Sequence, residues 1–156
     1  MLQIEIPDFA SLSLKHLVLD FNGTLALDGE LLPGIRERLA QLALQLVIHV
    51  VTGDTFGKAQ SHLAGLPCDL TVLPRESQSG AKRGYVERLG ASSCVCIGNG
   101  RNDRLMLDAA ALAIAVIQHE GACAETLRAA HVVVPTIHDA LDLLAYPKRL
   151  VATLRG

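Results

Sequence analysis

The sequence predicts an α/β protein in which helices cover both faces of a parallel sheet. Short apolar runs rich in Val, Ile and Leu recur along the chain, and each ends in turn or cap residues. Apolar residues at helical spacing lie between these runs, so that strands and helices alternate. Because the chain has 156 residues, half of them hydrophobic, we expect a single domain over residues 1–156.

The core strands are expected at the apolar runs 16–20, 46–51, 69–73, 94–98, 112–117 and 131–134. Helical spacing of apolar residues is found within 35–46, 85–89, 105–112 and 137–144. Right-handed crossovers bring the carboxyl ends of parallel strands to one rim, where a ligand binds near the switch in strand order. The alternating segment 2–6 is expected to add an edge strand before the first core strand.

Charge and apolar patterning exclude several classes of function. The formal net charge is -2 and no block of Lys or Arg occurs, so we expect no nucleic-acid partner. The longest apolar run, AAALAIAVI, is shorter than the roughly 20 residues of a membrane-spanning helix. The N-terminus does not resemble a secretion signal, which predicts a cytoplasmic protein without a membrane partner. The cysteines, Cys94 and Cys96 among them, are interpreted as small buried hydrophobic residues.

Polar residues follow several of the predicted strands at the point where each ends. Asp20 follows the first, the residues TGD at 52–54 follow the second, and the loop GNGRND at 98–103 follows the fourth. Lys82 lies early in the helix before the fourth strand, from where its long side chain could reach the same rim. We therefore expect a carboxylate, a hydroxyl, an ammonium group and a Gly-rich acidic loop to converge there.

This set of groups suits the transfer of a phosphoryl group to an aspartate. Asp20 would be the nucleophile, while Lys82, the Thr52 hydroxyl and backbone amides of residues 21–23 and 53 would stabilise the charge on the phosphoryl oxygens. A Mg²⁺ ion held by Asp20 and Asp103 would neutralise the two anions that have to meet.

The motifs LDFNGTLA, VVTGD, Lys82 and IGNGRNDRLMLDAA, taken in this order, resemble those of the haloacid dehalogenase (HAD) superfamily of phosphotransferases. More narrowly, TGD and GNGRND are similar to the phosphorylation domain of P-type ATPases and to small soluble proteins related to it. The resemblance covers roughly residues 15–120. It implies a three-layer, Rossmann-like fold and a hydrolase that acts on phosphate esters or acyl phosphates with Mg²⁺ as cofactor.

The resemblance also implies roles for individual residues. The catalytic residues would be Asp20, which becomes aspartyl phosphate, with Asn22, Thr52 and Lys82. The phosphate would be bound by Gly23, Thr52, Gly53 and Lys82, and the metal by Asp20, the backbone carbonyl of Asn22, Asn99 and Asp103.

The spacing of the motifs leaves no room for a cap domain, so the site should be open. The loop LALDGELLP at 25–33 is the only local flap. An open site suggests either a macromolecular substrate, such as a phosphorylated protein, or a homo-oligomer in which a neighbouring subunit covers a small phosphorylated molecule.

Two departures from the resembled pattern predict slow turnover. Asn22 stands where the phosphatases of the superfamily have an acid that protonates the leaving group and then activates water. An amide can do neither, and losing general acid-base catalysis costs about 10²- to 10⁴-fold in rate. Asn99 likewise replaces an acid, which should weaken Mg²⁺ binding. We therefore expect a Mg²⁺-dependent phosphotransferase or phosphatase whose aspartyl phosphate is hydrolysed slowly.

Other interpretations remain open. The chain could be a non-catalytic module that binds Mg²⁺ or phosphate, with the two amides marking lost catalysis. A signalling receiver domain also phosphorylates an aspartate near a Thr and a Lys. Receiver domains, however, have an acidic pair after the first core strand and accept the phosphate later in the chain, whereas here Asp20 closes that strand and Gly-Thr follows. Two single residues also have alternative interpretations. Asp54 could bind phosphate or cap a helix beginning at Thr55. Lys82 could be one of the lysines that only solvate a helix face.

Overall fold

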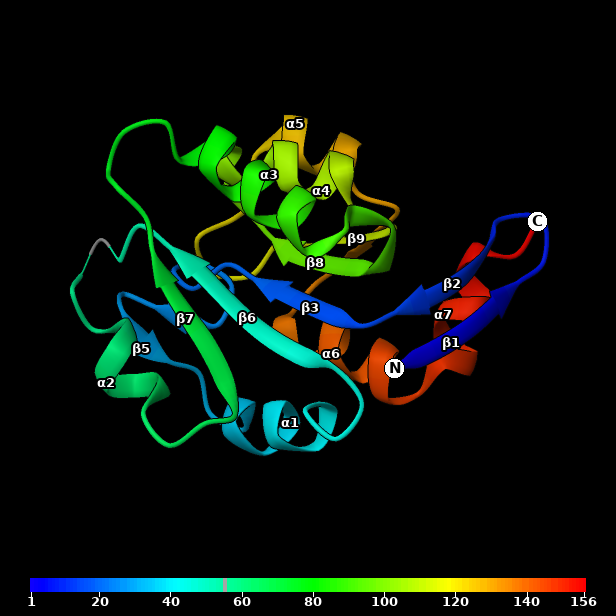
Figure 1. The fold of residues 1–156 in the computed structure, drawn as a ribbon, viewed down its shortest axis with the longest axis horizontal. Coiled ribbons are helices and arrows are strands. Elements are labelled where there is room, and N and C mark those ends of the chain that lie inside the picture. The colour runs from blue at the N-terminus through cyan, green and yellow to red at the C-terminus, as the bar shows by residue number, and fades with distance from the viewer. Residues whose placement is uncertain (55) are drawn as a thin grey trace.

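A six-stranded parallel sheet forms the centre of the molecule in the computed structural model, which describes residues 1–54 and 56–156 (Figure 1). Its strand order is β10-β9-β8-β3-β6-β7. The strands are β3 (His16–Leu19), β6 (Val47–Thr52), β7 (Cys68–Val72), β8 (Cys94–Gly98), β9 (Leu112–Val116) and β10 (Val132–Val134). Each predicted core run therefore forms a strand. The strand order reverses between β3 and β8, and this switch lies beside Asp20.

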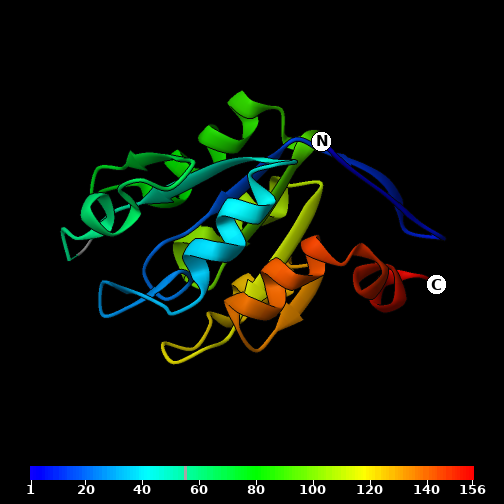
Figure 2. The same ribbon diagram turned by 90° about the horizontal axis from the view of Figure 1, so that it is seen from below.

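Helices cover both faces of this sheet, as predicted (Figures 1 and 2). One face carries α3 (Gln78–Leu89), α4 (Arg104–Ala109) and α5 (Ala124–Ala129), and the other carries α1 (Ile35–Leu42) and α6 (Ile137–Ala145). The remaining helices are α2 (Ala59–Leu63), α7 (Pro147–Leu154) and the 3₁₀ turns Ala91–Ser93 and Arg101–Asp103. Helix α1 ends at Leu42 rather than at 46, because residues 43–46 form a turn that leads into β6.

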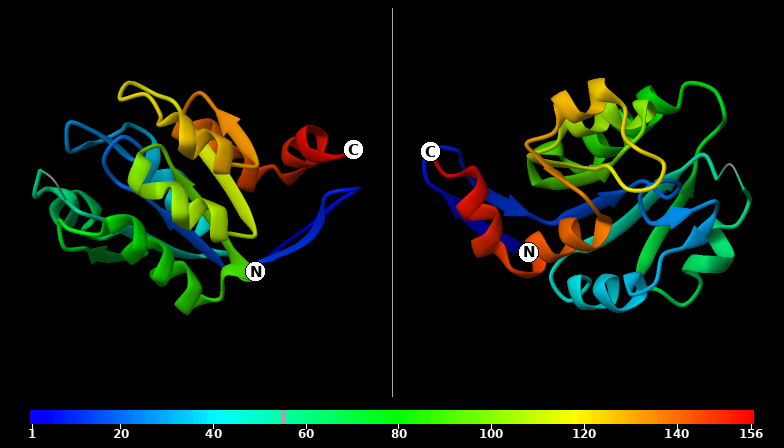
Figure 3. Two further views of the ribbon diagram at one scale, coloured as in Figure 1. Left: turned by 90° about the horizontal axis from the view of Figure 1, so that it is seen from above. Right: turned by 180° about the vertical axis from the view of Figure 1, so that it is seen from behind.

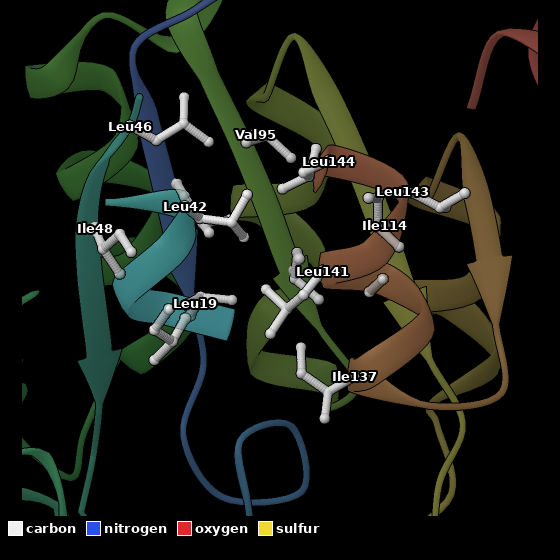
Figure 4. Close-up of a cluster of buried hydrophobic side chains, with 14 of the residues drawn as sticks. Leu19, Leu42, Leu46, Ile48, Val95, Ile114, Ile137, Leu141, Leu143 and Leu144 are labelled. Atoms are coloured by element: carbon white, nitrogen blue, oxygen red, sulfur yellow. The ribbon is translucent and has the colours of Figure 1, made fainter. Parts of the chain in front are cut away.

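The side-chain alternation of the strands divides the apolar core between the two faces. Leu19, Val95 and Ile114 pack toward α1 and α6, where they meet Leu42 and Leu141 (Figure 4). The opposite face is lined by Val18, Cys94, Cys96, Met106 and Leu107. Among the described residues all cysteines are free; Cys94 and Cys96 are fully buried on one face, as predicted, whereas Cys68 and Cys123 are only half-buried.

The N-terminal segment corrects one prediction. Strand β1 (Leu2–Ile6) does not join the edge of the core sheet. It pairs antiparallel with β2 (Ala10–Leu14) in a separate two-stranded sheet, against which α7 packs (Figures 1 and 3). The reason is local: a second alternating run, ASLSL, follows directly, and Asp8 adopts φ 62° in the turn between the two strands. Alternation identified the strand correctly but not its partner.

A short hairpin follows the first core strand. Strands β4 (Ala26–Leu27) and β5 (Glu30–Leu31) form the flap that the sequence predicts at 25–33. The Glu30 carboxylate contacts Lys58 Nζ and lies 2.9 Å from His62 Nε2, so the flap is attached to the α2 segment. Within the described residues, no helix is long and apolar enough to cross a membrane.

Candidate active site

Asp20 lies directly after β3, at the carboxyl edge of the sheet. Its backbone N–H donates to the carbonyl of Ile97 at 3.1 Å, which holds it against β8, and the residue is only 5% exposed. The chain then turns tightly, because the carbonyl of Phe21 accepts the N–H groups of residues 24–26. Gly23 adopts φ 80°, and a Cβ there would lie 2.5 Å from the Asn99 amide. Only glycine fits this turn.

Lys82 joins two carboxylates in the interior. Its Nζ donates to Asp20 Oδ1 at 2.6 Å and to Asp103 Oδ1 at 2.7 Å. Lys82 and Asp103 are fully buried. The side chain comes from the first turns of α3, as the sequence predicts, so the alternative in which Lys82 solvates a helix face is wrong.

The loop after β8 orients the second carboxylate. Asp103 Oδ2 accepts the backbone N–H groups of Asn99 and Gly100, each at 2.9 Å. Gly98 allows this arrangement, since a Cβ on it would lie 2.5 Å from the Asp103 carboxylate. The Thr24 hydroxyl lies between the two loops, 3.2 Å from Asp20 Oδ2 and 3.3 Å from Asn99 Oδ1.

The electrostatics of this cluster reflect one ammonium group shared by two carboxylates. Burial and the charge of Asp103 raise the pKa of Asp20 to about 6, against the opposing attraction of Lys82. Burial alone would lower the pKa of Lys82, but the charges of Asp20 and Asp103 outweigh it and raise this pKa. Above about pH 6 the cluster therefore carries an uncompensated negative charge in the interior.

Replacing Asp20 with Asn should stabilise the metal-free protein at alkaline pH. The pKa of Asp20 is about 6 in the folded protein and 3.8 ordinarily, so the folded state binds the proton more tightly. The contribution of Asp20 to the free energy of unfolding therefore falls as pH rises through this window. In chelator, D20N should unfold with a free energy up to about 3 kcal/mol higher than the wild type near pH 8.

Urea denaturation at several pH values measures this difference, which should shrink to a small fraction near pH 4 and vanish only below the ordinary pKa of 3.8. The control is Asp28→Asn at the exposed flap turn, where φ is 51° and Asn is tolerated. A D20N variant that is less stable than the wild type near pH 8 would contradict the inferred charge balance.

Other predicted site residues lie at the same edge but contact different groups. Thr52 is buried at the end of β6, and its hydroxyl accepts the N–H of Asp54 at 2.9 Å rather than reaching the carboxylates. Gly53 lies against the side chain of Gln78 at the start of α3. Asn22 is half-buried, and its Oδ1 is buried without a hydrogen-bond partner among the described residues.

Asp54 acts as a capping residue. Its Oδ1 accepts the N–H groups of Lys58 and Ala59, each at 3.0 Å, where α2 begins. The predicted helix start at Thr55 lies outside the described residues. These contacts favour the capping interpretation over a phosphate-binding one.

The oxygen atoms of the site fit a hard divalent cation such as Mg²⁺. Among the described residues there is no group of three or more His, Cys, Asp or Glu side chains placed to hold a metal. Mg²⁺ does not need such a group, because it takes one or two carboxylates and completes its shell with water and phosphate oxygen. Asp20 Oδ2 and Asn99 Oδ1 share one weak donor, the Thr24 hydroxyl, so both retain lone pairs for a cation.

Sequence reasoning assigned no role to Thr24 or Gln118. Gln118 Nε2 donates to the carbonyls of Gly23 at 3.0 Å and Thr24 at 2.8 Å, while its Oε1 accepts the N–H of Ile137 at 2.8 Å. It thereby ties the Asp20 loop to the start of α6. Thr24 could have been found from its place in the first motif, whereas no local pattern distinguishes Gln118.

Comparison with known sequences gives little information about function. No family model matches the chain. An uncharacterized protein from Methanocaldococcus jannaschii, MJ0073, is 51% identical over 61 residues, which are 39% of this chain and 66% of that protein. The chain thus matches just under two thirds of the length of this relative.

Solved structures give a stronger comparison. The 3-deoxy-D-manno-octulosonate 8-phosphate phosphatase of Moraxella catarrhalis, in complex with magnesium, phosphate and KDO, superposes with a TM-score of 0.67 over 92% of this chain and 94% of that chain, at 17% identity. The cobalt-bound enzyme of Haemophilus influenzae gives a TM-score of 0.67 over 92% and 94%, at 16% identity. A Legionella pneumophila protein described as a HAD superfamily (subfamily III A) hydrolase gives 0.68 over 91% and 87%, also at 16% identity.

The superpositions establish the fold. Because the sequence identities are low, the activity has to be argued from the site. The superpositions run over nearly the whole length of each chain, and the flap that follows β3 is only a two-stranded hairpin. The chain has the fold of the haloacid dehalogenase superfamily, with no cap domain in the residues that the structure describes.

Proposed function

We propose that this protein is a metal-dependent phosphotransferase or phosphatase that forms an aspartyl phosphate on Asp20. The observation that carries the proposal is the buried cluster in which Lys82 joins Asp20 and Asp103 at the carboxyl edge of the sheet. A lysine and two acids are seldom buried together without a function, because removing three charges from water is costly. The phosphatases that share the fold support the same chemistry.

In the first step, the Asp20 carboxylate attacks phosphorus, and the bond from phosphorus to the leaving oxygen breaks with its electron pair on the leaving group. Lys82 holds the carboxylate through Oδ1 and offsets the charge of the phosphoryl group. Gly23 gives the turn its left-handed backbone, with φ 80°, but its N–H donates to the carbonyl of Ala26 at 2.8 Å, so a phosphoryl oxygen would have to compete for this group. Thr52 and Gly53, at the neighbouring strand end, are proposed to bind the same oxygens.

The second step, attack of water on the aspartyl phosphate, is expected to be slow. Asn22 can neither take a proton from water nor give one to the departing oxygen. For the same reason the first step favours leaving groups that are stable as anions, such as acyl and aryl oxygens. The phosphoenzyme should therefore accumulate.

A divalent cation, Mg²⁺ by the chemistry of the oxygen ligands, would be held by Asp20, Asp103, the Asn22 carbonyl and Asn99, and would supply further charge neutralisation. The donor is proposed to be a phosphorylated small molecule or protein. Three points stay predictions. They are a second copy that covers the open site, a cytoplasmic location, and the likeness to the phosphorylation domain of P-type ATPases.

Trapping the phosphoenzyme tests this function. After incubation with acetyl phosphate and Mg²⁺, intact-mass and peptide mass spectrometry should find one phosphoryl group, located on Asp20. The adduct should be absent from Asp20→Ala and retained by Asp108→Ala, which removes an exposed carboxylate on α4. Absence of any adduct from the wild-type protein would contradict the proposal and favour a non-catalytic module that binds Mg²⁺ or phosphate.

A further inference from the structure

A cavity of about 490 Å³ lies beside the flap, at the end of the sheet where β9 and β10 finish. Its walls are largely apolar and come from Leu32 after the flap, Ile117 after β9 and Pro135 after β10. The remaining lining residues are polar: Gln118, His119, Thr136 and His138. This volume falls within the range of cavities that hold small organic ligands.

The cavity is continuous with the loop that carries the nucleophile. A narrow recess of about 10 Å³ shares Leu32, Gln118 and His119 with the cavity and extends to Gly23. Gln118, which lines both, also donates to the carbonyls of Gly23 and Thr24. The recess has about the size of one water molecule, so a molecule with its phosphoryl group at Asp20 would have to pass over the outer side of Gly23 to place its remaining part in the cavity.

The Asp20 site and the cavity favour the same kind of phosphate donor. Without an acid at position 22, the reaction favours leaving groups that depart as stable anions, and aryl and acyl oxygens are the common organic examples. The surface exposed to the cavity is mostly apolar, which favours a ring or a hydrocarbon chain on such a group, and the polar lining residues offer partners for a substituent on it.

We propose that this cavity binds the apolar part of an aryl or acyl phosphate whose phosphoryl group is transferred to Asp20. The inference rests on the proposed function and adds the substrate class to it. Transfer forms the bond from Asp20 oxygen to phosphorus and breaks the bond to the aryl or acyl oxygen, which leaves as a phenolate or carboxylate.

Acetyl phosphate and benzoyl phosphate test the cavity directly, because their leaving acids are similar and only benzoyl phosphate carries a ring. The measurement is the concentration that gives half-maximal rate of Asp20 labelling. For the wild type it should be about tenfold or more lower with benzoyl phosphate, as expected for burial of an apolar ring.

Ile117→Asp places a charge in the cavity wall and should remove this preference, while labelling by acetyl phosphate stays unchanged. Val133→Asp is the matched control, since Val133 on β10 has the same 44% exposure as Ile117 but does not line the cavity. Leu32→Asn changes the flap side of the same cavity and should likewise weaken the preference for benzoyl phosphate.

The outcomes distinguish failure of the cavity assignment from failure of the proposed function. Labelling of Asp20 with equal half-maximal concentrations of the two donors, or an equal effect of Ile117→Asp on both, would overturn the cavity assignment and leave the proposed function standing. Labelling by neither donor would overturn the proposed function itself.

Discussion

Replacing Asn22 with Asp is expected to speed release of phosphate from phosphorylated Asp20 by about 10²- to 10⁴-fold, the usual contribution of general acid-base catalysis. Asp and Asn have nearly the same shape, and Asn22 Oδ1 is buried without a partner among the described residues. The substitution therefore leaves the packing as it is and adds a group that can take a proton from water. The other parts of the site, Asp20, Lys82 and Asp103, are already in contact.

The measurement is single-turnover loss of labelled phosphate after removal of the donor. Asn99→Asp is the matched control, because it adds the same charge on the neighbouring loop, where the Asn99 side chain contacts Thr24 and Gly121, rather than at position 22. It should strengthen Mg²⁺ binding but release phosphate at nearly the wild-type rate. If both variants gained equally, added charge rather than proton transfer would be the cause, and the role given to position 22 would fail.

The core of this site could be predicted from the sequence because its parts depend on local rules. Asp20 and the loop beginning at Gly98 each end a buried strand, and parallel strands place such ends at one edge. Lys82 could be placed from its position in the first turns of α3. These placements need no knowledge of how individual side chains rotate.

Some of the missed features depend on contacts between distant segments, and others depend on a choice between nearby partners. Thr24 and Asn99 are 75 residues apart in sequence, and the contact of Gln118 with Thr24 spans 94 residues. The Thr52 hydroxyl faces its own loop instead of the carboxylates, because a nearer backbone donor, the N–H of Asp54, is available. The partner of β1 was missed because alternation gives a strand its faces but not its neighbour.

Lys82→Met is expected to lower the free energy of unfolding at neutral pH by about 3–5 kcal/mol, the usual cost of removing one partner from a buried ion pair. Lys82 is fully buried and donates to both carboxylates, so a methionine of similar length would fill the space and leave two buried anions unpaired. Urea denaturation measures the loss. The variant should also fail to form the adduct on Asp20, because nothing would then offset the incoming phosphate charge.

Two companion variants decide whether charge or packing is responsible. Lys58→Met removes the partner of Glu30 on the surface. The Lys58 side chain is 45% accessible, so this substitution should lower the free energy of unfolding by less than about 1 kcal/mol. Adding Asp20→Asn to Lys82→Met should restore part of the stability, since a single carboxylate then remains, and Asp103 still accepts two backbone N–H groups. If the double variant were no more stable than Lys82→Met, the loss would come from packing. The electrostatic account of the cluster, in which one ammonium group allows two acids to be buried together, would then be wrong.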